Sequence, residues 1–80
     1  MAVSAYILIQ TEVGQAETVA SHARDLAGVT VSEGVTGPYD VIVKAEASSV
    51  DELGRMVVSR LQHIEGITRT LTCPVVDLAP

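Results

Sequence analysis

The chain has 80 residues, a formal net charge of −5 and one cysteine. This length allows one domain with a thin core, so we expect a single domain over residues 1–80. Five basic residues against ten acidic ones leave no surface that could neutralise phosphates, which argues against direct nucleic-acid binding.

Apolar residues make up 48% of the chain and charged residues 19%. A body this small cannot bury all of that apolar surface, and self-association is the usual way to cover the remainder. The lone Cys73 cannot form an intrachain disulfide, as is typical of the reducing cytoplasm. The apolar run at residues 5–9 is too short for a membrane span or a signal peptide.

The first predicted strand covers residues 3–11. Apolar side chains occur in both alternating sets, which is typical of a strand covered on both faces. The two sets are Val3, Ala5, Ile7 and Ile9 against Ser4, Tyr6, Leu8 and Gln10.

A helix is predicted next, with an apolar stripe between residues 16 and 27 and Gly28 as a left-handed cap. Residues 29–36 then read as a second strand, in which Gly34 indicates a bulge. A turn at Gly37-Pro38 leads to a third strand over residues 39–47.

Ser49 and Glu52 have the spacing of a capping box and predict the start of a second helix. We expect Gly66 to end it and residues 67–76 to form the fourth strand. Pro74 indicates an edge position or the end of pairing. The helix stripe would be Val50, Leu53, Val57, Leu61 and Ile64, and the strand would set Ile67, Leu71, Cys73 and Val75 against Thr68, Thr70 and Thr72.

The resulting order βαββαβ predicts an α+β, ferredoxin-like fold. Two helices would cover one face of a four-stranded antiparallel sheet. The other face would be open and would carry Tyr6, Leu8 and Ile42, which we expect to form an oligomer interface.

We find no candidate catalytic, metal or cofactor site. His22 and His63 lie off the apolar stripes, so no base is placed beside a nucleophile, and no residues have metal-ligand spacing. Cys73 reads as a small buried side chain. The sequence therefore argues against an enzyme.

The predicted turn at residues 35–40 combines groups that suit a zwitterion. Backbone amides and a hydroxyl suit a carboxylate, and Asp40 suits an ammonium group. The alternative is an ordinary turn with a solvated Asp40. Likewise, the threonines of the last strand either line a polar cleft on the open face or simply reflect strand propensity.

Three segments resemble the effector-binding domain (RAM domain) of Lrp/AsnC, or leucine-responsive/feast-famine, transcription regulators. They are residues 5–9 (AYILI), 35–44 (VTGPYDVIVK) and 66–72 (GITRTLT). The resemblance implies a ferredoxin-like domain that dimerises through its sheet, often assembles into octamers, and binds amino acids between subunits. The ligand-contacting residues it implies are Thr36, Gly37, Pro38, Tyr39 and Asp40, together with Thr70 and Thr72.

Regulators of this family carry a helix-turn-helix domain ahead of the module, whereas here the first strand follows Met1 almost at once. We therefore expect a cytoplasmic, homo-oligomeric amino-acid-binding domain that is able to assemble with a full-length relative. It would be a stand-alone protein, or alternatively a piece of a longer regulator. The alternatives are a small dimeric α/β-barrel enzyme and a ligand-free assembly or adaptor domain.

Overall fold

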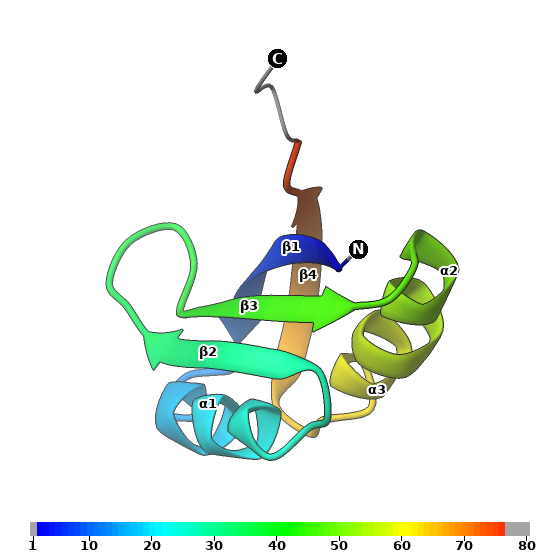
Figure 1. The fold of residues 1–80 in the computed structure, drawn as a ribbon. Coiled ribbons are helices and arrows are strands. Elements are labelled where there is room, and N and C mark those ends of the chain that lie inside the picture. The colour runs from blue at the N-terminus through cyan, green and yellow to red at the C-terminus, as the bar shows by residue number, and fades with distance from the viewer. Residues whose placement is uncertain (1, 77–80) are drawn as a thin grey trace.

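The computed structural model describes residues 2–76, and the side chains of all of these except residues 56–58. It contains one four-stranded antiparallel sheet with the strand order β2-β3-β1-β4. The predicted βαββαβ order and ferredoxin-like arrangement are confirmed (Figure 1). The elements are β1 (Val3–Thr11), α1 (Ala16–Arg24), β2 (Val29–Gly34), β3 (Val41–Ala47), α2 (Val50–Glu52), the π-helical segment η1 (Leu53–Val58), α3 (Ser59–Leu61) and β4 (Ile67–Pro74).

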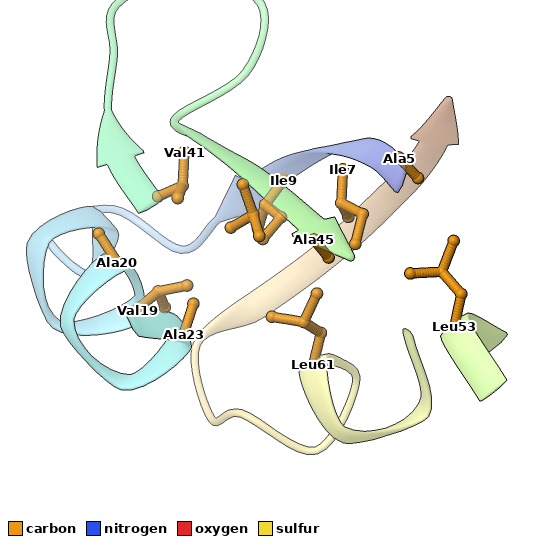
Figure 2. Close-up of a cluster of buried hydrophobic side chains, with 11 residues drawn as sticks. Ala5, Ile7, Ile9, Val19, Ala20, Ala23, Val41, Ala45, Leu53 and Leu61 are labelled. Atoms are coloured by element: carbon orange, nitrogen blue, oxygen red, sulfur yellow. The ribbon is translucent and has the colours of Figure 1, made fainter. Parts of the chain in front are cut away.

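Both helical segments pack on the same face of the sheet, where an aliphatic core forms (Figure 2). The alternate residues of β1 and β3 that face the helices have no exposed surface, as their alternation predicts. The buried residues are Ala5, Ile7 and Ile9 of β1, Val41, Val43 and Ala45 of β3, Val19, Ala20 and Ala23 of α1, and Leu53 and Leu61 of the second helical segment.

Helix α1 ends at Arg24, earlier than the stripe up to residue 27 predicts. The backbone N–H of Asp25 donates to the carbonyl of His22 at 3.2 Å, so the last turn tightens to a three-residue step. Gly28 has a φ of 94° and provides the predicted left-handed residue before β2.

The second helical segment begins with the predicted cap. The Ser49 hydroxyl accepts a hydrogen bond from the backbone N–H of Glu52 at 3.1 Å, whereas the Glu52 carboxylate accepts from the Ser48 hydroxyl. Val50 was wrongly placed in the buried stripe: it is 69% exposed, because α2 lies beyond the end of β3 (Figure 1). The side chain of Val57 lies outside the described residues.

Strand β2 is shorter than predicted and ends at Gly34. Its irregularity lies between Val29 and Val31 rather than at Gly34. The Thr30 hydroxyl there donates to the carbonyl of Lys44 at 3.2 Å. Strand β3 likewise begins at Val41 instead of residue 39, so residues 35–40 form a loop.

The predicted faces of β4 are wrong for Thr70 to Cys73, whereas Ile67 packs against the core, as predicted for the set opposite the threonines. Leu71 lies opposite Leu8, and Cys73 lies opposite Tyr6. Residues that are directly opposite share a face, so Leu71 and the exposed Cys73 belong to the open face.

Thr70 and Thr72 of β4 consequently lie on the helix side. Thr70 pairs with Ile9 and Thr72 with Ile7. Both are half-buried. The helices pack chiefly over the other strands, so the helix side of this edge strand tolerates hydroxyl groups. Strand β4 ends at Pro74, two residues before the predicted end at residue 76. It is an edge strand and Pro74 is its last paired residue, so both positions indicated for Pro74 are found.

Candidate functional site

The loop at residues 35–40 is closed at its base by backbone hydrogen bonds. Val35 N–H donates to the carbonyl of Asp40, and Asp40 N–H donates to the carbonyl of Ile9, both at 2.9 Å. The side-chain amide of Gln10 donates to the carbonyl of Pro38 at 2.9 Å. The loop, which projects from the sheet in Figure 1, is therefore held against β1.

Asp40 stands where this loop joins β3, and it is half-buried. Its Oδ2 atom accepts a hydrogen bond from the backbone N–H of Thr11 at 2.8 Å. The other carboxylate oxygen makes no hydrogen bond within residues 2–76, and no buried side-chain oxygen among them lacks a partner. One oxygen of Asp40 thus fixes the end of β1, while the other faces solvent.

A groove of about 910 Å³ separates this loop from α1. We call it the α1 groove. It brings together charged and hydroxyl side chains of α1 with residues at the end of β2 and in the loop. Its lining residues are Ala16, Glu17, Ala20, Ser21, Arg24, Gly34, Val35, Thr36 and Asp40.

Two hydrogen bonds tie α1 to β2 beside the groove. The Ser32 hydroxyl donates to the carbonyl of Ala20 at 2.8 Å. The Arg24 guanidinium donates through Nη2 to the carbonyl of Ser32, also at 2.8 Å. The position of the guanidinium is therefore fixed at the outer edge of β2.

The predicted loop residues are together in the structure, but only some of them reach the groove. Thr36 and Asp40 line it. Gly37 and Pro38 are exposed in the loop, and Tyr39 is half-buried. Hence Gly37, Pro38 and Tyr39 shape the loop without lining the groove.

Thr70 and Thr72 are not brought to the loop within one chain. Strand β4 lies on one side of β1, and β3, which Asp40 precedes, lies on the other. Thr70 lines a separate hollow of about 230 Å³ beside Gln62.

The predicted interface residues do share the open face. Leu8 and Ile42 are directly opposite each other and half-buried. Tyr6 is 44% exposed, with the Lys44 ammonium 5.6 Å from its ring centroid. The sequence reasoning missed Val31 and Leu71, which enlarge the same apolar surface.

The sequence reasoning also missed Glu17, Ser21 and Arg24 as a group. Their spacing of i, i+4 and i+7 places them on one side of α1. The available signal was this polar stripe beside the apolar one, but a solvated helix face explains such a stripe equally well. Only the structure shows that the loop at residues 35–40 lies across the groove from it.

Both histidines are exposed, as predicted. Residues 2–76 contain no group of three His, Cys, Asp or Glu side chains that could hold a metal ion. Within that same stretch, no helix has the length and apolar character needed to span a membrane.

Comparison with known proteins places the chain in a family. Residues 4–78 match the Lrp/AsnC ligand binding domain. An HTH-type transcriptional regulator of Pyrococcus horikoshii, PH1916, is 33% identical over 72 residues, which cover 86% of this chain and 48% of the regulator. The chain thus spans about half the length of the curated relatives it matches.

Solved structures agree with this result. The protein TTHA0845 from Thermus thermophilus is 27% identical, with a TM-score of 0.88 over 98% of both chains. The transcriptional regulator NMB0573 of Neisseria meningitidis, solved as a complex with L-Met, shares the fold at 18% identity, with a TM-score of 0.80 over 98% of this chain and 52% of its own. The chain belongs to the family of Lrp/AsnC ligand-binding domains, and it is a regulatory domain rather than an enzyme.

Proposed function

We propose that residues 1–80 form one cytoplasmic regulatory domain that binds an amino acid as an effector and acts through oligomerisation. The observation that carries this proposal is the position of Asp40. Its carboxylate is fixed by Thr11 through one oxygen, while the other oxygen is free at the α1 groove. Membership of a ligand-binding family supports a ligand at such a site.

The loop offers complementary groups for both charges of an amino acid. Thr36 lines the α1 groove, and its backbone N–H donates no hydrogen bond within residues 2–76. This free amide and the Thr36 hydroxyl suit a carboxylate, and the free oxygen of Asp40 suits an ammonium group. The fold relative that was solved with L-Met supports this ligand class.

The open face supports self-association. Tyr6, Leu8 and Ile42 would pack against a second copy of the chain, since an apolar sheet face of this kind needs a cover. In this proposal Thr70 and Thr72 contact a ligand only from a neighbouring subunit. A full-length Lrp/AsnC regulator is the proposed partner in mixed assemblies.

The test is calorimetry of the purified protein against the common amino acids, followed by Asp40→Asn. The asparagine keeps an oxygen to accept from Thr11 N–H, so the fold should be retained. A charge-assisted hydrogen bond contributes about 1.5–3 kcal/mol, so affinity should fall roughly ten- to a hundredfold.

Asp25→Asn is the matched control, because Asp25 is an exposed carboxylate outside the groove. It should bind as the parent does. Equal affinity of Asp40→Asn and the parent would remove Asp40 from the site. A panel without any binding would favour the ligand-free adaptor.

A further inference from the structure

The two ends of the α1 groove carry opposite charge. Glu17 lies in the first turn of α1, which follows the end of β1, and Asp40 holds that same end through Thr11 N–H. Arg24 lies at the other end of α1 and is anchored on Ser32. The carboxylates and the guanidinium therefore stand at opposite ends.

The separation of these ends can be estimated in two ways. Glu17 and Arg24 are seven positions apart in α1, which separates their Cα atoms by about 10 Å along the helix axis. The carbonyl of Asp40 accepts a hydrogen bond from the backbone N–H of Val35, so Asp40 lies beside Val35. The three-residue step along the chain from Ser32, where Arg24 is anchored, to Val35 also spans about 10 Å. The ammonium and carboxylate groups on the Cα of any amino acid lie only about 2.5 Å apart. The α-ammonium and α-carboxylate groups of one ligand therefore cannot reach opposite ends of the α1 groove.

The guanidinium has unused binding capacity. Arginine carries five N–H donors in a planar fork, and a single side-chain hydrogen bond, to the carbonyl of Ser32, engages them within residues 2–76. An arginine fork matches a carboxylate better than it matches a neutral amide. The far end of the groove thus suits an anionic side chain.

We propose that the α1 groove selects an acidic amino acid, with glutamate as the best match. This inference rests on the proposed function and specifies its ligand. The α-ammonium group binds at Asp40 and Glu17, and the α-carboxylate binds the backbone amide and the hydroxyl of Thr36. The side-chain carboxylate reaches toward Arg24. From the α-ammonium nitrogen to a side-chain carboxylate oxygen, extended glutamate measures about 6 Å, and a hydrogen bond at each end brings the span to about 12 Å, which is enough to reach from one end of the groove to the other.

Calorimetry with three ligands tests the selection. Glutamate should bind at least tenfold more tightly than glutamine, which has the same shape without the charge. Lysine should bind more weakly than glutamine, because its ammonium would approach the guanidinium. Equal affinity for glutamate and glutamine would overturn the inference while leaving amino-acid binding intact.

Arg24→Gln then tests the residue. It should reduce the glutamate preference to about twofold or less and change the affinity for glutamine little, whereas Arg24→Lys should retain part of the preference. If Arg24 had a purely structural role, Arg24→Gln would lower the affinities for glutamate and glutamine by the same factor and leave their ratio unchanged. That result would contradict the assignment. Asp40→Asn should instead weaken both ligands, so the two proposals fail separately.

A steric pair tests the location. Ser21 is exposed, lines the groove and makes no side-chain hydrogen bond within residues 2–76, so Ser21→Trp should fill the groove and abolish glutamate binding. Thr18→Trp adds the same bulk to an exposed position of α1 outside the groove and should bind normally. Binding by Ser21→Trp at the affinity of Thr18→Trp would place the ligand elsewhere.

Discussion

Ser32 is the only polar side chain that is buried among the residues whose side chains are described. Only 4% of its surface is exposed, and its hydroxyl donates a hydrogen bond to the carbonyl of Ala20. The backbone carbonyl of Ser32 accepts a hydrogen bond from the guanidinium of Arg24. Ser32 therefore ties α1 to β2 through two hydrogen bonds, which involve two residues that line the groove, Ala20 and Arg24.

Replacing Ser32 by alanine should lower the free energy of unfolding by about 0.5–1.5 kcal/mol, the usual net contribution of one hydrogen bond. Urea unfolding of the parent and the variant measures this difference. Ser59→Ala is the control, because Ser59 is exposed on the second helical segment and its change should be close to zero. Equal midpoints for all three proteins would mean that the Ser32 hydroxyl contributes nothing.

At the scale of residues, the sequence predicts the groups that one short segment supplies. Thr36 and Asp40 are four residues apart in one turn, so their chemistry can be read together. Arg24 and Asp40 belong to different parts of the chain, and both line the α1 groove only because of how α1 packs on β2. No local pattern contains that information, so the sequence could anticipate Thr36 and Asp40 on the loop side of the groove but not the α1 side.

Gly66 joins the second helical segment to β4 and shows how elements are fitted together. Its φ is 101°, in the left-handed region. A Cβ atom at this position would lie 3.2 Å from both Gln15 Cβ and Val19 Cγ2. Its carbonyl also accepts from Glu12 N–H at 2.8 Å, so this turn touches the chain between β1 and α1.

Gly66→Ala should destabilise the protein more than Gly14→Ala does. Gly14 also has a positive φ, of 81°, but an added Cβ would meet nothing within 4 Å. Both variants incur about 1–2 kcal/mol of backbone strain, and only Gly66→Ala adds crowding of about 1 kcal/mol or more. Thermal or urea unfolding gives both values, and a smaller loss for Gly66→Ala would refute the packing argument.

At the scale of elements, the alternation of β1 and β3 predicts their faces correctly, because the helices cover one side of each. The same reasoning fails for β4. Alternation alone fixes which residues share a face but not which face points to the helices, since a one-residue change of register inverts both. Only the pairing of Leu71 with Leu8 decides it.

For the whole molecule, the two faces of the sheet differ in how their apolar groups are covered. The helices complete one core, whereas the other face leaves Tyr6, Val31 and Leu71 exposed around the half-buried Leu8 and Ile42. The correction at β4 strengthens the expectation of self-association, because it moves apolar side chains to the uncovered face. Composition predicts a surplus of apolar surface, but only the register shows where it gathers.

Assembly is therefore the property that a change on this face should alter first. We expect the parent protein to sediment well above its monomer mass of 8.4 kDa at micromolar concentration, and Leu8→Lys to shift it toward the monomer. Leu8 is at the centre of the open face, opposite both Ile42 and Leu71. A lysine there remains solvated in a monomer but would have to lose its water in an interface, which is costly without a partner.

Val13→Lys provides the comparison, since Val13 is fully exposed at 102% and lies in the turn before α1, away from the sheet face. It introduces the same charge and should leave the sedimentation of the oligomer unchanged. Circular dichroism of both variants should match the parent, because neither side chain belongs to the helix-covered core. A Leu8→Lys protein that sediments as the parent does would exclude the open face as the interface, and a parent of 8.4 kDa at every concentration would exclude assembly by this chain alone.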